Sequence, residues 1–81
     1  MDKGELAKFT GTYASKEIPL KITVSEKNGE LFAQATGQGA FPLTFREENT
    51  FVFAAAGIEM IFGDNSFILN QGGTKFNFTK E

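Results

Sequence analysis

The segment from residue 58 to residue 78 constrains the fold most, because it can pair with itself twice in one consistent register. Two-residue turns at residues 64–65 and 72–73 would place Phe67 and Leu69 on the same face in both hairpins. Side chains alternate along a strand, so a register wrong by one residue would set these two opposite polar partners. The segment therefore predicts a three-strand antiparallel meander. The expected pairs are Phe62 with Phe67, Met60 with Leu69, Ile61 with Ile68, Leu69 with Phe76, Phe67 with Phe78, Ile68 with Asn77 and Asn70 with Lys75.

The earlier part of the chain shows the same alternation. Apolar and polar side chains alternate over residues 9–13 and again over residues 18–25, which predicts two strands separated by a polar link. Asn28-Gly29 then predicts a type I′ turn, because both residues tolerate positive φ. A third strand is expected over residues 31–36. The turn sets Val24 opposite Ala33, Ile22 opposite Ala35 and Lys27 opposite Glu30.

Two more turns lead into the fourth and fifth strands. Residues 37–39 are expected to form a three-residue loop with glycine in the left-handed position. Pro42 lacks an N–H donor, so a bulge or a break in pairing is expected beside it. Residues 47–49 predict another three-residue loop with Asn49 left-handed, followed by a strand over residues 50–53. The expected pairs are Ala35 with Phe41, Ala33 with Leu43 and Phe45 with Phe51.

Eight short strands joined by tight turns predict an all-β domain. Pairing the last strand with the first would remove both sheet edges, so we expect an eight-stranded antiparallel up-and-down barrel, with a curled open sheet as the alternative. Asp2 and Glu5 resemble a weak helix start, which predicts a short N-terminal helical turn, and Leu6 is expected to plug one end. The expected inward set is Phe9, Tyr13, Ile18, Leu20, Ile22, Val24, Leu31, Ala33, Ala35, Phe41, Leu43, Phe45, Phe51, Phe53, Ile58, Met60, Phe62, Phe67, Leu69, Phe76 and Phe78.

Composition indicates one folded domain over residues 1–81. Ten phenylalanines supply a large aromatic core, and the absence of cysteine means that packing, not disulfides, must stabilise it. Net charge is −2 and the basic residues are scattered singly, which argues against nucleic acid as a partner. No apolar run approaches the roughly 20 residues of a membrane-spanning helix, and Met1 is not followed by a signal peptide.

The sequence offers little for catalysis or for cofactors. The chain has no histidine to activate a nucleophile, and no lysine follows Ser15, Ser25 or Ser66 at the spacing of a serine-lysine pair. Without cysteine or histidine, no thiolate and imidazole cluster can hold a metal. We therefore expect neither an enzyme nor a bound cofactor.

Two kinds of binding remain open. Phe32, Val52, Ile61 and Ile68 are predicted on the outer face, where a joined apolar patch would dock a neighbouring domain or a second copy. The other hypothesis is a carrier of a small apolar ligand, because eight strands can just fill a barrel or leave room for one small molecule. Glu26 is predicted on the inner face opposite Leu31, so these two residues would form the barrel mouth.

Short motifs along nearly the whole chain, with their spacing, resemble one family. This is the small lipocalin-like domain of unknown function at the C-terminus of many bacterial β-lactamase-related serine hydrolases. The motifs are Phe9-Thr10-Gly11-Thr12-Tyr13, Gly29-Glu30-Leu31, Gly37-Gln38 with Phe41-Pro42-Leu43, Phe51, residues 58–62 and Gln71-Gly72-Gly73.

The resemblance implies an eight-stranded lipocalin-like barrel, typically exported, that is appended to a penicillin-binding-protein-type catalytic domain. Its implied role is accessory, either covering or shaping the active site or mediating assembly. The hydrolase motifs Ser-x-x-Lys and Tyr-x-Asn belong to the other domain and do not occur in this chain. No catalytic residue is therefore carried over to this sequence.

Overall fold

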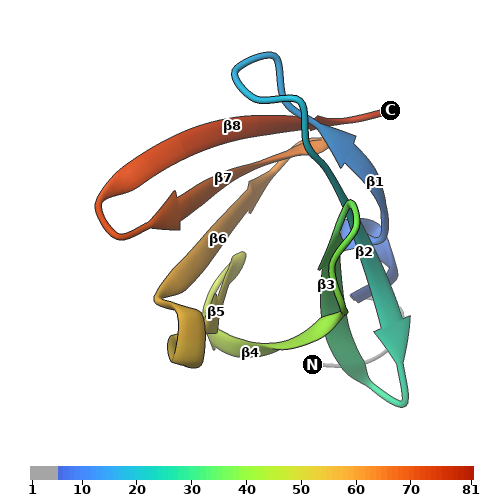
Figure 1. The fold of residues 1–81 in the computed structure, drawn as a ribbon. Helices are drawn as coiled ribbons and strands as arrows, with labels where there is room; N and C mark the ends of the chain where they lie inside the picture. Colours follow the sequence, from blue (N-terminus) through green and yellow to red (C-terminus); the bar gives the residue numbers. More distant parts are fainter. Residues whose placement is uncertain (1–5) are drawn as a thin grey trace.

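A computed structural model describes residues 6–81 as a closed barrel of eight antiparallel strands, in which each strand pairs with the next and the last pairs with the first (Figure 1). This confirms the predicted architecture. The strands are β1 (Gly11–Ala14), β2 (Lys21–Lys27), β3 (Glu30–Ala35), β4 (Phe41–Glu47), β5 (Thr50–Phe53), β6 (Ile58–Gly63), β7 (Ser66–Gln71) and β8 (Thr74–Lys80), with 3-10 turns η1 (Ala7–Phe9) and η2 (Ala54–Ala56).

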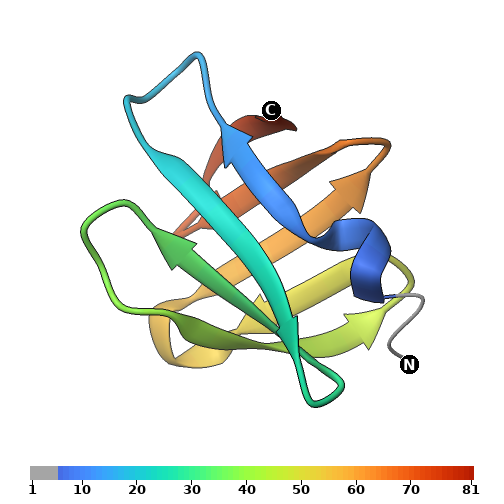
Figure 2. The same ribbon diagram turned by 90° about the vertical axis from the view of Figure 1, so that its right-hand side faces the viewer.

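The two ends of the barrel differ. The short turns after β2, β4 and β6 lie at the same end as η1; Figure 2 shows η1 and the turns after β4 and β6 on its right side and the turn after β2 at the bottom. Leu6 and Phe9 are buried there, so the expected plug by Leu6 is confirmed. The longer loops after β1, β3 and β5 lie at the other end, together with the tight turn after β7. The helical turn predicted at Asp2 to Glu5 lies outside the described residues.

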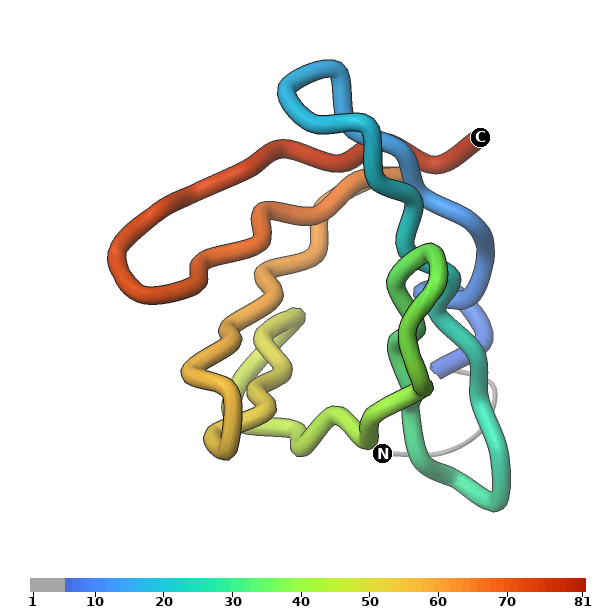
Figure 3. Tube along the Cα trace, viewed as in Figure 1, coloured from blue at the N-terminus to red at the C-terminus, as the bar shows by residue number. Residues whose placement is uncertain are grey.

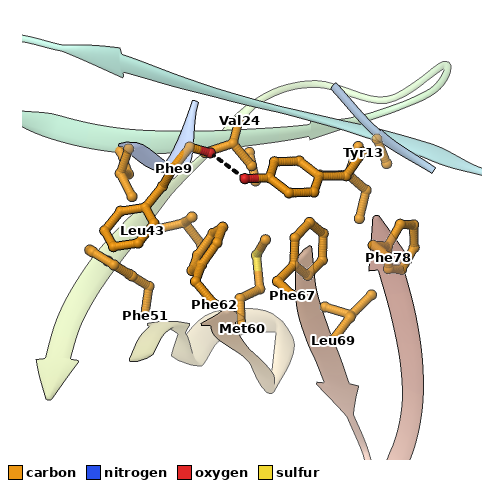
Figure 4. Close-up of a cluster of buried hydrophobic side chains, with 14 of the residues drawn as sticks. Phe9, Tyr13, Val24, Leu43, Phe51, Met60, Phe62, Phe67, Leu69 and Phe78 are labelled. Atoms are coloured by element: carbon orange, nitrogen blue, oxygen red, sulfur yellow. Dashed lines mark hydrogen bonds between the residues drawn. The ribbon is translucent and has the colours of Figure 1, made fainter. Parts of the chain in front are cut away.

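The barrel interior is filled by aromatic and aliphatic side chains (Figure 4). Phe67 lies at its centre with 1% of its surface exposed, and its ring centroid is 4.8 Å from that of Tyr13, 5.3 Å from that of Phe62 and 4.9 Å from that of Phe78. Such spacings are those of favourable edge-on and offset contacts between rings. Most of the expected inward residues are buried. The buried core consists of Leu6, Phe9, Tyr13, Ile22, Val24, Leu31, Ala33, Ala35, Leu43, Phe51, Met60, Phe62, Phe67, Leu69 and Phe78.

Tyr13 ties the N-terminal turn to the barrel. Its hydroxyl donates to the carbonyl oxygen of Phe9 at 2.9 Å (Figure 4). Thr10 also bonds back to Ala7, through both its backbone N–H and its hydroxyl. Residues 9 and 10 therefore belong to the turn and its cap, and the strand predicted over residues 9–13 begins at Gly11 instead.

Burial raises the pKa of Tyr13 above its ordinary value of about 10. The neutral phenol is the form that the folded state favours, so its contribution to stability is fully present below the unfolded pKa. As pH rises beyond that value, the unfolded chain ionises first and the contribution is lost up to the folded pKa. We expect wild-type protein to lose melting temperature above about pH 10 faster than Tyr13→Phe.

Thermal unfolding of both proteins across alkaline pH measures this difference. Both proteins contain the same lysines, so the effect of lysine titration on the melting temperature cancels in the comparison. Tyr13 is the only tyrosine, so tyrosinate absorbance also reports its ionisation directly. Parallel melting curves for the two proteins over the whole alkaline range would contradict the prediction.

The short turns confirm most of the expected pairings. Asn28, Asn49 and Asn65 all have positive φ, between 55° and 59°, as their turns require. The registers of β2 with β3, β6 with β7 and β7 with β8 are those that the sequence predicts. Phe45 also pairs with Phe51 as expected, although the turn after β4 has two residues and the extra one forms a bulge between Phe45 and Glu47.

The register of β3 with β4 was predicted wrongly by two residues. Leu31 pairs with Leu43 and Ala33 with Phe41, because the loop between the strands spans residues 36–40. A shift of two preserves the face on which each side chain lies. The inward set therefore survives the error.

The bulge expected at Pro42 is also absent, since Pro42 pairs regularly with Phe32. The two-residue turn at residues 28–29 makes Lys27 and Glu30 a hydrogen-bonded pair, and alternation directs the backbone groups of Phe32 toward β2. The pair of Phe32 with Pro42 is then non-hydrogen-bonded. Pro42 therefore withholds no donor from β3, and the prediction failed for this reason.

Several expected inward side chains are not fully buried. Phe45 is 49% exposed because it lies at the rim of the plugged end, past the last complete layer of the core. The strand predicted over residues 18–25 begins only at Lys21. The remaining half-buried members pack against the core from the other end or from its loops, and they are Ile18, Leu20, Phe41, Phe53, Ile58 and Phe76.

Candidate interaction surface

Ile61 and Ile68 form the apolar contact that the sequence predicts. They are cross-strand partners on β6 and β7, with 38% and 37% of their surfaces exposed. Thr50 pairs with Ile61 on one side, and Asn77 pairs with Ile68 on the other. The row across β5 to β8 thus has two isoleucines in its middle, with the buried Thr50 at one end and the exposed Asn77 at the other.

Val52 lies close to this pair but is half-buried. Arg46 on β4 and Glu59 on β6 form an ion pair of 2.8 Å between Nη1 and Oε2, which spans the intervening strand β5. Arg46, Val52 and Glu59 line one groove of about 410 Å³. The ion pair therefore makes the surroundings of Val52 polar, and this residue contributes less to an apolar surface than its sequence position suggests.

Phe32 lies apart from the isoleucines. It pairs with Ser25 on one side and Pro42 on the other, and it is half-buried. Strands β4 and β5 separate β3 from β6. The four predicted surface residues are thus not one patch: the structure brings together Ile61 and Ile68 only.

Glu26, at the predicted barrel mouth, has a structural role. Glu26 pairs with Leu31 as expected, and its Oε2 accepts a hydrogen bond of 2.7 Å from the backbone N–H of Gly29. The carboxylate thus closes its own hairpin turn. Leu31 is buried in the core and also borders a groove of about 300 Å³ with Leu6 and Phe45. This end therefore has a surface groove beside a packed plug.

Alternation of side chains did not reveal the half-buried apolar rim at the other end. The loops there have no charged residue over residues 36–40 or residues 54–57. Phe41 and Phe53 stack with ring centroids 4.8 Å apart, beside Ile58 and Phe76. The two uncharged loops, which follow β3 and β5, were the available sequence signal for this apolar rim.

The described residues supply little for chemistry. Across residues 6–81, no three His, Cys, Asp or Glu side chains lie close enough to hold a metal ion. Within the same part of the chain, no helix is long and apolar enough to span a bilayer. Ser15 Oγ accepts a hydrogen bond from the backbone N–H of Glu17 at 3.1 Å, which is a turn contact.

Comparisons with known proteins add no relative: no protein-family model, no curated protein and no solved structure matches this chain significantly.

Proposed function

We propose that this barrel is a non-catalytic interaction domain that docks through Ile61 and Ile68. The observation that carries the proposal is the position of these two isoleucines, paired side by side on an outer face and more than a third exposed. Joined apolar side chains on so small a surface favour contact with another protein. The resemblance described above supports an accessory role beside a β-lactamase-related serine hydrolase, in an exported protein.

The packed interior supports docking over carriage of an apolar ligand. Tyr13, Met60, Phe67 and Phe78 fill the centre of the barrel and are almost fully buried. A pocket of about 300 Å³, the small end of the range for ligand sites, would require several of these side chains to move apart. A separate carrier function therefore has less support.

Ile61→Lys is expected to weaken docking by at least about tenfold, because a charge replaces half of an apolar pair at the centre of the contact. Sedimentation velocity measures self-association of the purified domain and its binding to a penicillin-binding-protein-type catalytic domain. Thr23→Lys is the matched control, since it adds the same charge to an exposed outer position on β2. Equal association of wild type and Ile61→Lys would contradict the surface assignment.

A further inference from the structure

The barrel closes over only part of its last strand. β1 and β8 share two residue pairs, Tyr13 with Lys80 and Ala14 with Thr79. A third contact is the hydrogen bond from the N–H of Glu81 to the carbonyl of Thr12 at 2.9 Å. Within residues 6–81, no strand pairs with residues 74–78 on the β1 side of β8. In Figure 1 and Figure 3, β8 extends past β1.

Alternation identifies the backbone groups on this edge. The two-residue turn at residues 72–73 makes Gln71 and Thr74 a hydrogen-bonded pair, so Phe76 also directs its groups toward β7. The N–H and C=O groups of Lys75 and Asn77 then point away from β7. Both side chains are exposed. Residues 74–77 thus present a short row of backbone donors and acceptors to solvent, as an edge strand does.

A carboxylate from the loop between β1 and β2 accepts a hydrogen bond from one of these N–H groups. Glu17 Oε1 accepts the backbone N–H of Asn77 at 2.9 Å and its side-chain Nδ2 at 3.4 Å. The oxygen lies where the carbonyl of a neighbouring strand would lie. A groove of about 270 Å³ runs beside this contact and is lined by Lys16, Glu17, Asn77 and Thr79.

Apolar side chains lie on the inner side of the same edge. Phe76 alternates with Lys75 and Asn77, so it faces inward, and it is half-buried against the core. Ile18 and Leu20, from the same loop as Glu17, are half-buried as well. A strand added beside β8 would direct every second side chain toward these residues.

We propose that the outer edge of residues 74–77 in β8 binds an extended peptide, which adds to the sheet as a further strand and displaces the carboxylate of Glu17. Backbone hydrogen bonds provide the affinity in this mode, and alternate side chains provide the selectivity. The peptide has apolar residues at every second position, over Phe76. An acidic residue lies on its other face, opposite Lys75.

Charge selects this occupant over a second copy of the chain. Self-pairing centred on Phe76 would set Lys75 opposite Asn77 of the other copy, and the edge sequence Thr-Lys-Phe-Asn offers no acid to meet the lysine. It would also displace Glu17 in both copies, whereas a peptide displaces it in one. An acidic, alternately apolar segment matches the edge better on both counts.

The test uses a short capped peptide that alternates valine with glutamate and threonine, titrated into the isotope-labelled protein. Amide chemical shifts are expected to change at residues 74–77 and at Glu17. The same peptide N-methylated at alternate residues cannot form the ladder and serves as the control. The proposal is overturned if the two peptides bind equally, if neither binds, if the shifts centre on Ile61 and Ile68, or if the unliganded protein dimerises through β8.

Variants separate the parts of the site. Glu17→Ala removes the competing acceptor and is expected to tighten peptide binding about three- to tenfold. Lys75→Glu is expected to weaken it by a similar factor, since like charges then face each other across the strands. Ile61→Lys is expected to leave peptide binding unchanged. The peptide site and the docking face of the proposed function can therefore be confirmed or refuted independently. No tightening in Glu17→Ala, with the fold intact by circular dichroism, would refute the displacement.

Discussion

Phe67→Ala is expected to lower the free energy of unfolding by about 3–5 kcal/mol, the range for removing a fully buried phenylalanine. The ring is 1% exposed and contacts Tyr13, Phe62 and Phe78, so three aromatic contacts are lost together. The interior is lined by strands on all sides and cannot collapse to fill the space. A domain of this length is stable by about 4–12 kcal/mol, so this one substitution is expected to remove a large fraction of the stability.

Urea denaturation followed by circular dichroism measures this loss. Phe45→Ala is the matched control, because it removes the same side chain from a position that is 49% exposed with one ring neighbour, Phe51, at 5.6 Å. Its cost is expected to stay below about 1.5 kcal/mol, from the smaller area removed from water. Similar losses for the two variants would mean that Phe67 is not the centre of the core.

Leu6→Ala is expected to cost about 2–4 kcal/mol, because Leu6 is buried at the plugged end beside Phe9 and its removal leaves a cavity there. Leu20→Ala removes the same side chain from the other end, where Leu20 is only half-buried. Its cost is expected to be under about 2 kcal/mol.

Thermal and urea unfolding of both variants compare the two barrel ends directly. The comparison needs no absolute stability, since both changes delete the same atoms. A larger loss for Leu20→Ala than for Leu6→Ala would show that the end with the longer loops, and not the plugged one, contributes more packing. Tyr13→Phe, which removes only the hydroxyl that donates to the carbonyl oxygen of Phe9, offers an independent check on the plug at neutral pH.

The hairpins of β2 with β3, β6 with β7 and β7 with β8 could be predicted from the sequence because two signals agree there. Asn28 and Asn65 fix the turn, and the alternation on either side fixes the face. The chain from β6 to β8 is the strongest case, since Phe67 and Leu69 satisfy two hairpins at once. Closure was predicted because an even number of strands allows the last strand to pair with the first, which removes both sheet edges.

The remaining errors come from positions where only one signal exists. Gly37 and Gly39 allow several loop lengths. A shift of two residues leaves every side chain on the same face, so the alternation of side chains could not determine the register of β3 with β4. Alternation also predicts that Phe45 faces inward, but it does not predict how far along the barrel the core extends. The hydrogen bond from Asn77 to Glu17 joins residues 60 positions apart, so no local sequence pattern predicts it.

Of the predicted interaction surface, the sequence could place Ile61 opposite Ile68 because the turn between them fixes their register. It could not show that the ion pair of Arg46 with Glu59 lies beside Val52, since long flexible side chains meet across strands without a sequence rule. The outward face of Phe32 was predictable, but its distance from β6 follows only from the strand order.

The pairing of β1 with β8 also determines when the barrel can close during synthesis on the ribosome. Synthesis proceeds from the N-terminus at about 5–20 residues per second, and hairpins form far faster than that. When residue 71 has emerged, seven strands can already have met their sequential neighbours, yet β1 still has no partner on its other side. Residues 79 and 80 supply it. The nascent domain therefore remains an unclosed sheet until almost all of it has been made, and its aromatic interior stays accessible to chaperones until then.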